Sequence, residues 1–163
     1  PMRSDSRGEV RIRSADPRRH PAITFNYLST EQDRTEWLEA VRMTRRILGQ
    51  PAFAEFDAGE ISPGPGVGSD EEILEWVARD GETALHPSGT ARLGLGPEAV
   101  VDPRTFRVHG VDGLRVVDAS LLPSITNANI YAPTMMIAER AADAVLGNSP
   151  LRPSDSTVYR GGT

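Results

Sequence analysis

Three histidines offer the acid–base chemistry best matched to neutral pH in this chain of 163 residues. His20 lies in a charged loop between two prolines, and His109 stands beside a glycine in an expected turn, so a structural interpretation is favoured for both. His86 precedes Pro87 and a Ser-Gly-Thr turn, a rigid setting that can hold an imidazole in one orientation. The residues alone make His86 a candidate for proton transfer, with a structural role still open.

Other reaction classes find little support in the sequence. The chain has no Cys, so it has neither a thiolate nucleophile nor a disulfide framework. It contains no G-x-S-x-G nucleophile elbow and no second histidine at a metal-binding spacing, so we expect no metal site. Glu71 and Glu72 form a carboxylate pair, but they fall in the first turn of an expected helix, where they favour the helix dipole. The glycine-rich run at 64–68 has no Lys and contains a proline, which makes it a poor phosphate-binding loop.

The composition is that of a globular protein, with 38% hydrophobic residues and a formal net charge of -5. All 18 basic residues are arginines, and they are scattered along the chain. A nucleic-acid-binding surface would need a basic excess, so we expect no nucleic-acid partner. No stretch approaches the roughly 20 apolar residues of a membrane span, and the first residues are polar, so neither an anchor nor a signal peptide is expected.

The first part of the chain combines strands with helices. Alternating apolar and polar residues predict two short strands, over 8–14 and 22–28. Ser29, with Gln32 three residues later as its capping-box partner, is expected to open a helix that ends at Gly49.

A second capping box, formed by Ser69 and Glu72, predicts a short helix that Gly81 closes. The following residues, 85–129, are expected to be mostly strand and turn because glycines recur through them. Within this range, 114–120 is apolar enough to predict a strand that is buried on both faces.

The last expected helix has Pro133 at its first position and ends at Gly147. It is apolar on most sides, which predicts that it packs inside something larger. The residues from Asn148 onward are polar and are expected to form a loose end.

The chain resembles the glucose–methanol–choline (GMC) oxidoreductase family in three segments within 86–143, which read HPSGTARLG, AVVDPRTFRVHGVDGLRVVDASLLP and ITNANIYAPTMMIAERAAD. Two further segments resemble its choline-oxidising branch, namely PMRSDSRGEVRIRSADPRRHPAITFNYLSTEQD and GEISPG. The resemblance implies an α+β fold in which residues 1–84 complete an antiparallel-sheet substrate domain with flanking helices. Residues 85–147 would be the active-site segment that returns to the FAD-binding domain, and 148–163 a loose tail.

The resemblance implies FAD as the cofactor. The strand–GxGxxG–helix unit that binds the ADP part of FAD is absent from this sequence, so the chain resembles roughly the last third of such an enzyme. We therefore expect its main partner to be the rest of the same enzyme. The chain alone is expected neither to hold FAD tightly nor to oxidise alcohol, and its apolar helix would favour self-association.

The implied reaction removes the hydroxyl proton of a small alcohol and transfers the α-hydride to flavin N5. His86 matches the family's active-site histidine, which acts as the base or as the electrostatic partner of the alkoxide. Asn129 matches a position that is His or Asn in the family, and its amide would donate to the substrate oxygen. By the same resemblance, contacts to FAD are expected from Asp118, Ala119, Asn129, Ile130, Tyr131 and Thr134.

Choline is the substrate that the resemblance favours, with betaine aldehyde as the product. Leu85 would contact the substrate together with His86 and Asn129, but it stands where choline-oxidising relatives usually carry an aromatic ring. Without that ring the site loses one cation–π contact to choline, worth about 0.5–2 kcal/mol. Another primary alcohol, aliphatic or aromatic, therefore stays open as the substrate. A non-catalytic module that binds a partner through its apolar helix is the second alternative. The full-length enzyme is expected in the cytoplasm, in peripheral contact with the inner membrane, because this branch passes electrons to a respiratory acceptor.

Overall fold

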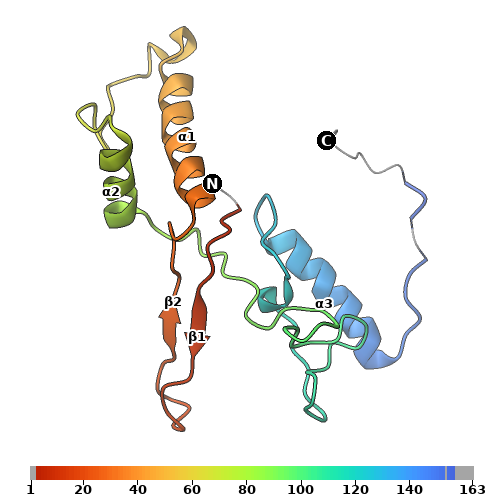
Figure 1. The fold of residues 1–163 in the computed structure, drawn as a ribbon. Helices are drawn as coiled ribbons and strands as arrows, with labels where there is room; N and C mark the ends of the chain where they lie inside the picture. Colours follow the sequence, from red (N-terminus) through yellow and green to blue (C-terminus); the bar gives the residue numbers. More distant parts are fainter. Residues whose placement is uncertain (1–2, 153, 157–163) are drawn as a thin grey trace.

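The computed structural model describes residues 3–152 and 154–156. Figure 1 shows a two-stranded hairpin and two packed helices on one side, and a third helix with surrounding loops on the other. The α+β class expected from the sequence is confirmed. The elements in chain order are β1 (Glu9–Arg11), β2 (Ala22–Thr24), α1 (Glu31–Leu48), the 3-10 turn η1 (Pro51–Phe53), α2 (Asp70–Asp80), the 3-10 turn η2 (Ala119–Leu121) and α3 (Tyr131–Leu146).

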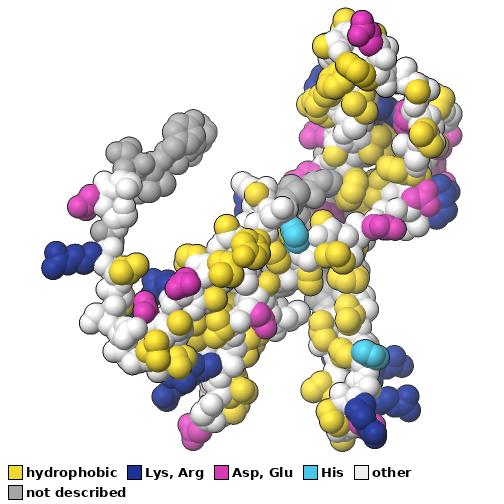
Figure 2. All heavy atoms as spheres, turned by 180° about the vertical axis from the view of Figure 1, so that it is seen from behind, with side chains coloured by type: hydrophobic (Ala, Val, Ile, Leu, Met, Phe, Trp, Pro, Cys, Tyr) yellow, Lys and Arg dark blue, Asp and Glu magenta, His cyan; other side chains and the backbone are white. Residues whose placement is uncertain are grey.

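Strands β1 and β2 form an antiparallel pair with Val10 opposite Ile23. Both strands are shorter than the alternating sequence pattern predicted. The Val10 and Ile23 side chains lie on one face of the pair and are 49% and 58% exposed, so this apolar face has no cover in the described part of the chain. The hairpin extends away from the helices, and arginines gather at its far end (Figure 2).

Helix α1 begins one residue later than the sequence predicted. The cap is Thr30, whose side chain accepts a hydrogen bond from the Asp33 backbone at 3.1 Å. The Ser29 side chain accepts no helix N–H among the described residues; the Ser29 backbone N–H instead donates to the Ser6 hydroxyl at 3.1 Å. Gln32 bonds to Glu36 further along the helix and takes no part in capping.

Asp33 ties the start of the chain to α1. Only 1% of this residue is exposed, and its Oδ2 atom accepts three hydrogen bonds. The donors are the Ser4 hydroxyl at 2.9 Å, the Ser6 hydroxyl at 2.7 Å and the Leu28 N–H at 3.1 Å. These donors replace the water lost around Oδ2, while the buried Oδ1 has no hydrogen-bond partner among the described atoms. We call these four residues the Asp33 clamp.

Helix α2 follows the sequence prediction closely. Ser69 and Glu72 form the expected capping box, and Gly81 caps the other end by donating to the Val77 carbonyl at 2.9 Å. Ile73 and Val77 face α1 and are 0% and 6% exposed. Their burial holds the two helices together in one lobe.

The strand predicted over 114–120 is not formed. Within this range only Arg115 pairs, through an isolated antiparallel bridge to Arg107, and no described segment continues the pairing. The prediction of burial on both faces was also wrong, since Leu114 is 48% and Val117 38% exposed. The segment has no partner strand among the described residues beyond this bridge, and at its end the Asp118 carboxylate accepts the Ser120 N–H at 2.8 Å and starts η2.

Helix α3 begins at Tyr131, two residues before the predicted start, and ends at Gly147, whose φ of 73° supports the left-handed cap. One side of α3 packs on the loops between α2 and α3 through a small core. Its members are Val101, Phe106, Leu121, Leu122, Ile137 and Ala141.

The opposite side of α3 is uncovered in this chain: Met136 is 54% and Leu146 73% exposed. The tail predicted from Asn148 onward has no regular structure where it is described, and residues 153 and 157–163 lie outside the described part. Among the described residues, no helix combines the length and the apolar character that crossing a bilayer requires.

Candidate active site

The segment that carries His86 is fastened to the segment around η2. The Ala91 N–H donates to the Ser120 carbonyl at 3.1 Å, and the Leu93 N–H donates to the Leu121 carbonyl at 2.9 Å. Gly89 makes the turn between His86 and this attachment with a φ of 84°, a conformation that favours glycine. The half-buried His86 is therefore presented by a short loop whose far end is fixed on the C-terminal core.

The structure brings His86 and Asn129 together. Nε2 of His86 lies 3.0 Å from Oδ1 of Asn129, across 43 residues of sequence. Because an amide oxygen only accepts, the imidazole donates its Nε2–H in this arrangement. The Asn129 amide nitrogen makes no hydrogen bond within the described residues, so it stays available to another acceptor. The two residues predicted to act on the substrate thus form one unit.

The surroundings of His86 favour its protonated form. The Asn129 side chain raises the pKa of His86 most, the Leu85 backbone raises it further, and the small loss of hydration opposes both. A hydrogen-bond acceptor stabilises the imidazolium more than the neutral ring, which explains the direction. The unit is accordingly suited to hold a proton, or a positive charge, beside an oxygen that becomes negative.

The sequence predicted that Asp118 and Ala119 belong to a strand. In the structure they lie at the start of η2. The Asp118 carboxylate is occupied by its own turn, through the bond to the Ser120 N–H. Their link to the His86 loop is indirect: η2 accepts the backbone bonds from Ala91 and Leu93 that hold this loop in place.

The N-terminus of α3 follows directly after Asn129 and is uncapped. Its cap residue Ile130 gives no side-chain hydrogen bond, and the first turn contains no acidic side chain. Within that turn, the Thr134 N–H donates to the Ile130 carbonyl at 2.9 Å, while the buried Thr134 hydroxyl has no partner among the described atoms. A helix N-terminus with free N–H groups attracts electron-rich or anionic groups. The predicted cofactor contacts Ile130, Tyr131 and Thr134 therefore share one polar, positively biased end of the helix.

Leu85 lies next to His86 in the sequence, and Tyr131 lies two residues after Asn129. Both side chains are exposed. Leu85 precedes His86, adopts a φ of 60° and is 79% exposed. Its N–H donates to the Thr83 hydroxyl at 3.1 Å, a bond that supports this uncommon backbone conformation. Tyr131 is 74% exposed. Both side chains are free to contact a molecule that approaches His86 and Asn129.

The structure also reveals groups that reasoning from the sequence missed. The Asp33 clamp depends on contacts between distant segments, and no local pattern marked it. Trp37 and Trp76 line a common cavity although 39 positions separate them, and no local sequence pattern indicates this. No group of three possible metal ligands occurs among the residues that the structure describes.

Comparison with known proteins identifies the family of the chain. The sequence model described as GMC oxidoreductase matches residues 4–138 of the chain. The chain belongs to the GMC oxidoreductase family. One GMC relative, the oxygen-dependent choline dehydrogenase of Staphylococcus aureus, is 57% identical over 99% of this chain. The match covers 29% of that relative, so the chain spans less than a third of its length.

Solved structures share the fold of this GMC segment. Pyridoxine 4-oxidase from Mesorbium loti superimposes with a TM-score of 0.83 at 34% sequence identity, covering 91% of this chain and 29% of that protein. Formate oxidase from Aspergillus oryzae, studied for the modification of its FAD, has a TM-score of 0.79 at 33% identity, over 86% of this chain and 24% of its own. The predicted family and α+β fold are thus confirmed.

Proposed function

We propose that this chain is the C-terminal, active-site part of an FAD-dependent alcohol dehydrogenase that oxidises choline to betaine aldehyde. The observation that carries the proposal is the hydrogen bond between His86 and Asn129, placed directly before the uncapped N-terminus of α3. The 57% identity to a choline dehydrogenase over nearly the whole chain supports the choice of substrate.

The residues at the start of α3 fit a flavin. The free N–H groups of the first turn and the buried, unpartnered Thr134 hydroxyl suit the polar edge of the ring system. Ile130 and Tyr131 would hold the ring through their backbone groups, and Asn129 would lie beside it. FAD, when bound, supplies the acceptor for the hydride. The resemblance places its ADP-binding unit in the rest of the enzyme, so the 163-residue chain alone is not expected to retain it.

His86 and Asn129 act on the alcohol oxygen. The Asn129 amide nitrogen donates to that oxygen and fixes its position, while the Asn129 amide oxygen keeps a proton at Nε2 of His86. As the hydroxyl proton leaves, negative charge grows on the oxygen. Because Nε2 of His86 already carries the hydrogen that faces Asn129, neutral His86 would receive this proton at Nδ1; if the ring is already protonated, the proton would pass to water and the imidazolium would stabilise the alkoxide by its charge. Electrons and protons balance because the alcohol loses one proton from oxygen and one hydride from carbon.

A second candidate substrate is an aromatic primary alcohol, and Leu85 favours it. The Leu85 side chain is apolar and 79% exposed, so it offers no π-face to a quaternary ammonium group. One structural neighbour at 34% identity is a pyridoxine oxidase, which acts on an aromatic substrate.

We place the full-length enzyme in the cytoplasm with peripheral contact to the inner membrane, on the expectation of a respiratory electron acceptor.

The test is steady-state oxidation by the full-length enzyme, with choline compared against 3,3-dimethyl-1-butanol and pyridoxine. The butanol has the shape of choline without its charge. We expect kcat/KM for choline to exceed that for the butanol by roughly tenfold or more. Equal values for the two would reject recognition of the cation, and preference for pyridoxine would assign the site to aromatic alcohols.

A further inference from the structure

A cavity of about 470 Å³ lies between α1, α2 and the loop that connects them. Trp37 of α1 and Trp76 of α2 both line it, and they are the two tryptophans of the chain. Its volume falls within the roughly 300–1,000 Å³ typical of small-molecule sites. His86 and Asn129 do not line it, so it is separate from the candidate active site.

The walls of the cavity are held in place by polar contacts. The Trp76 ring N–H donates to the Ser62 hydroxyl at 3.2 Å, which fixes the indole to the loop. Arg45 binds both carboxylate oxygens of Glu60, at 3.0 and 2.9 Å, and also donates to the Gly64 carbonyl at 3.2 Å. These bonds attach the loop to both helices, so the cavity is formed before a ligand enters. Preorganisation of this kind lowers the cost of binding.

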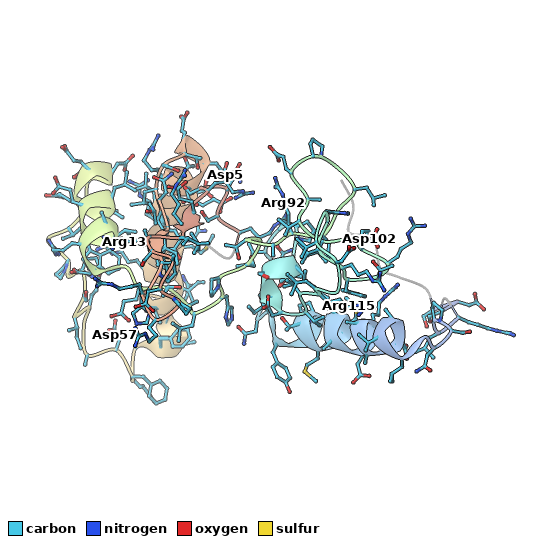
Figure 3. All side chains as sticks on the ribbon, turned by 90° about the horizontal axis from the view of Figure 1, so that it is seen from below. Asp5, Arg13, Asp57, Arg92, Asp102 and Arg115 are labelled. Atoms are coloured by element: carbon cyan, nitrogen blue, oxygen red, sulfur yellow. The ribbon has the colours of Figure 1, made fainter. Side chains whose placement is uncertain are left out.

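The charge of the walls is unbalanced. Arg45 neutralises Glu60, but Asp57, which also lines the cavity, has no ion pair among the described residues. One Asp57 oxygen accepts the Gly59 N–H at 2.8 Å, and this bond fixes the carboxylate within its own turn. Figure 3 shows Asp57 on the loop that leaves the end of α1. The lining of the cavity thus combines two tryptophans with one carboxylate that has no ion pair among the described residues.

We propose that this cavity is a second ligand site, which binds a small organic cation with apolar groups, such as a quaternary ammonium ion. Indole faces attract a cation and also cover apolar methyl groups, and the Asp57 carboxylate supplies the opposite charge. An inorganic divalent cation fits less well, because it requires several oxygen ligands and Asp57 supplies the one uncompensated carboxylate. The site lies outside the proposed catalytic unit and stands independently of the proposed function.

Because both tryptophans line the cavity, tryptophan fluorescence of the 163-residue chain reports on its occupancy directly. We expect choline to cause a saturable fluorescence change, and the neutral isostere 3,3-dimethyl-1-butanol to bind roughly tenfold more weakly. Asp57→Asn should weaken choline binding roughly tenfold, whereas Asp112→Asn, a matched change of an exposed loop carboxylate outside the cavity, should leave it unchanged. Far-UV circular dichroism checks that the variants keep the fold.

Absence of a saturable change with choline would overturn the proposal. Equal affinity for choline and the neutral isostere would overturn recognition of the cation, and this comparison needs no variant. His86→Ala should bind choline in the cavity as the unchanged chain does. The two proposals are therefore tested separately: a result against binding in the cavity does not argue against oxidation of choline, and a result against oxidation does not argue against the cavity site.

Discussion

Nε2 of His86 and Oδ1 of Asn129 lie 3.0 Å apart, and this contact joins the loop after α2 to the segment that opens α3. Each partner sits on a support of its own. The His86 loop is bonded to η2, and Asn129 directly precedes a helix whose Ile137 and Ala141 lie in the C-terminal core. The geometry of the pair therefore depends on the packing of α3 against its neighbouring loops.

Removing the Asn129 amide should lower the pKa of His86. In Asn129→Ala the main cause of the raised pKa is lost, so the ring should titrate closer to its ordinary value of 6.5. The measurement is an NMR titration of the histidine ring protons, in which His20 and His109 serve as internal controls. An unchanged His86 titration in this variant would show that the contact does not control protonation.

The same pair should determine one of the pH values at which the activity of the full-length enzyme rises or falls. If His86 receives the hydroxyl proton, activity appears as pH rises through its pKa; if it acts as a cation, activity is lost there. In either case Asn129→Ala moves the midpoint to lower pH, because the raised pKa falls. Asn129→Asp should move it the opposite way, since a carboxylate favours the imidazolium. Coincident midpoints in kcat/KM–pH profiles of all three enzymes would contradict this assignment.

The Asp33 clamp should contribute measurably to stability. Asp33→Ala leaves two hydroxyls and the Leu28 N–H without their acceptor in a partly buried place, which should lower the free energy of unfolding by about 1–3 kcal/mol. Urea denaturation followed by circular dichroism measures the loss, with Asp112→Ala as an exposed control. A difference between the two variants below about 0.5 kcal/mol would contradict the clamp.

The stabilising effect of Asp33 also has a defined pH dependence. Burial raises the pKa of Asp33, but the hydroxyls of Ser6 and Ser4 and the Leu28 N–H outweigh it and lower the pKa below 3.8. A lowered carboxyl pKa adds stability that is present above the unfolded-state value and is lost as pH falls through the folded-state value. The gap between the original chain and Asp33→Ala should therefore close below about pH 4.

The sequence predicted local features well and long-range ones poorly. The Ser69–Glu72 capping box and the Gly147 cap depend on neighbouring residues, and both formed as expected. The strand over 114–120 failed because its apolar pattern described burial that this chain alone does not provide. His86 was a candidate from its own local setting and Asn129 followed from the family resemblance, but no local rule could show that packing of α3 brings them into contact.

The uncovered side of α3 should make the isolated chain self-associate. Met136 is 54% and Leu146 73% exposed, and exposed apolar side chains on one helix favour association. Met136→Gln combined with Leu146→Gln should shift sedimentation velocity profiles toward the monomer. Leu95→Gln, at a site 72% exposed on a loop, is the matched control and should have little effect. A chain that is monomeric without any substitution would contradict the prediction.

The central claim, that His86 and Asn129 act on an alcohol beside a flavin, is tested most directly by mixing the full-length enzyme with choline in the absence of oxygen. Flavin absorbance should bleach in the original enzyme. His86→Ala and Asn129→Ala should slow bleaching by about 10²-fold or more while the enzyme still binds flavin. Bleaching at an unchanged rate in both variants would contradict the account, as would a full-length enzyme that carries no flavin.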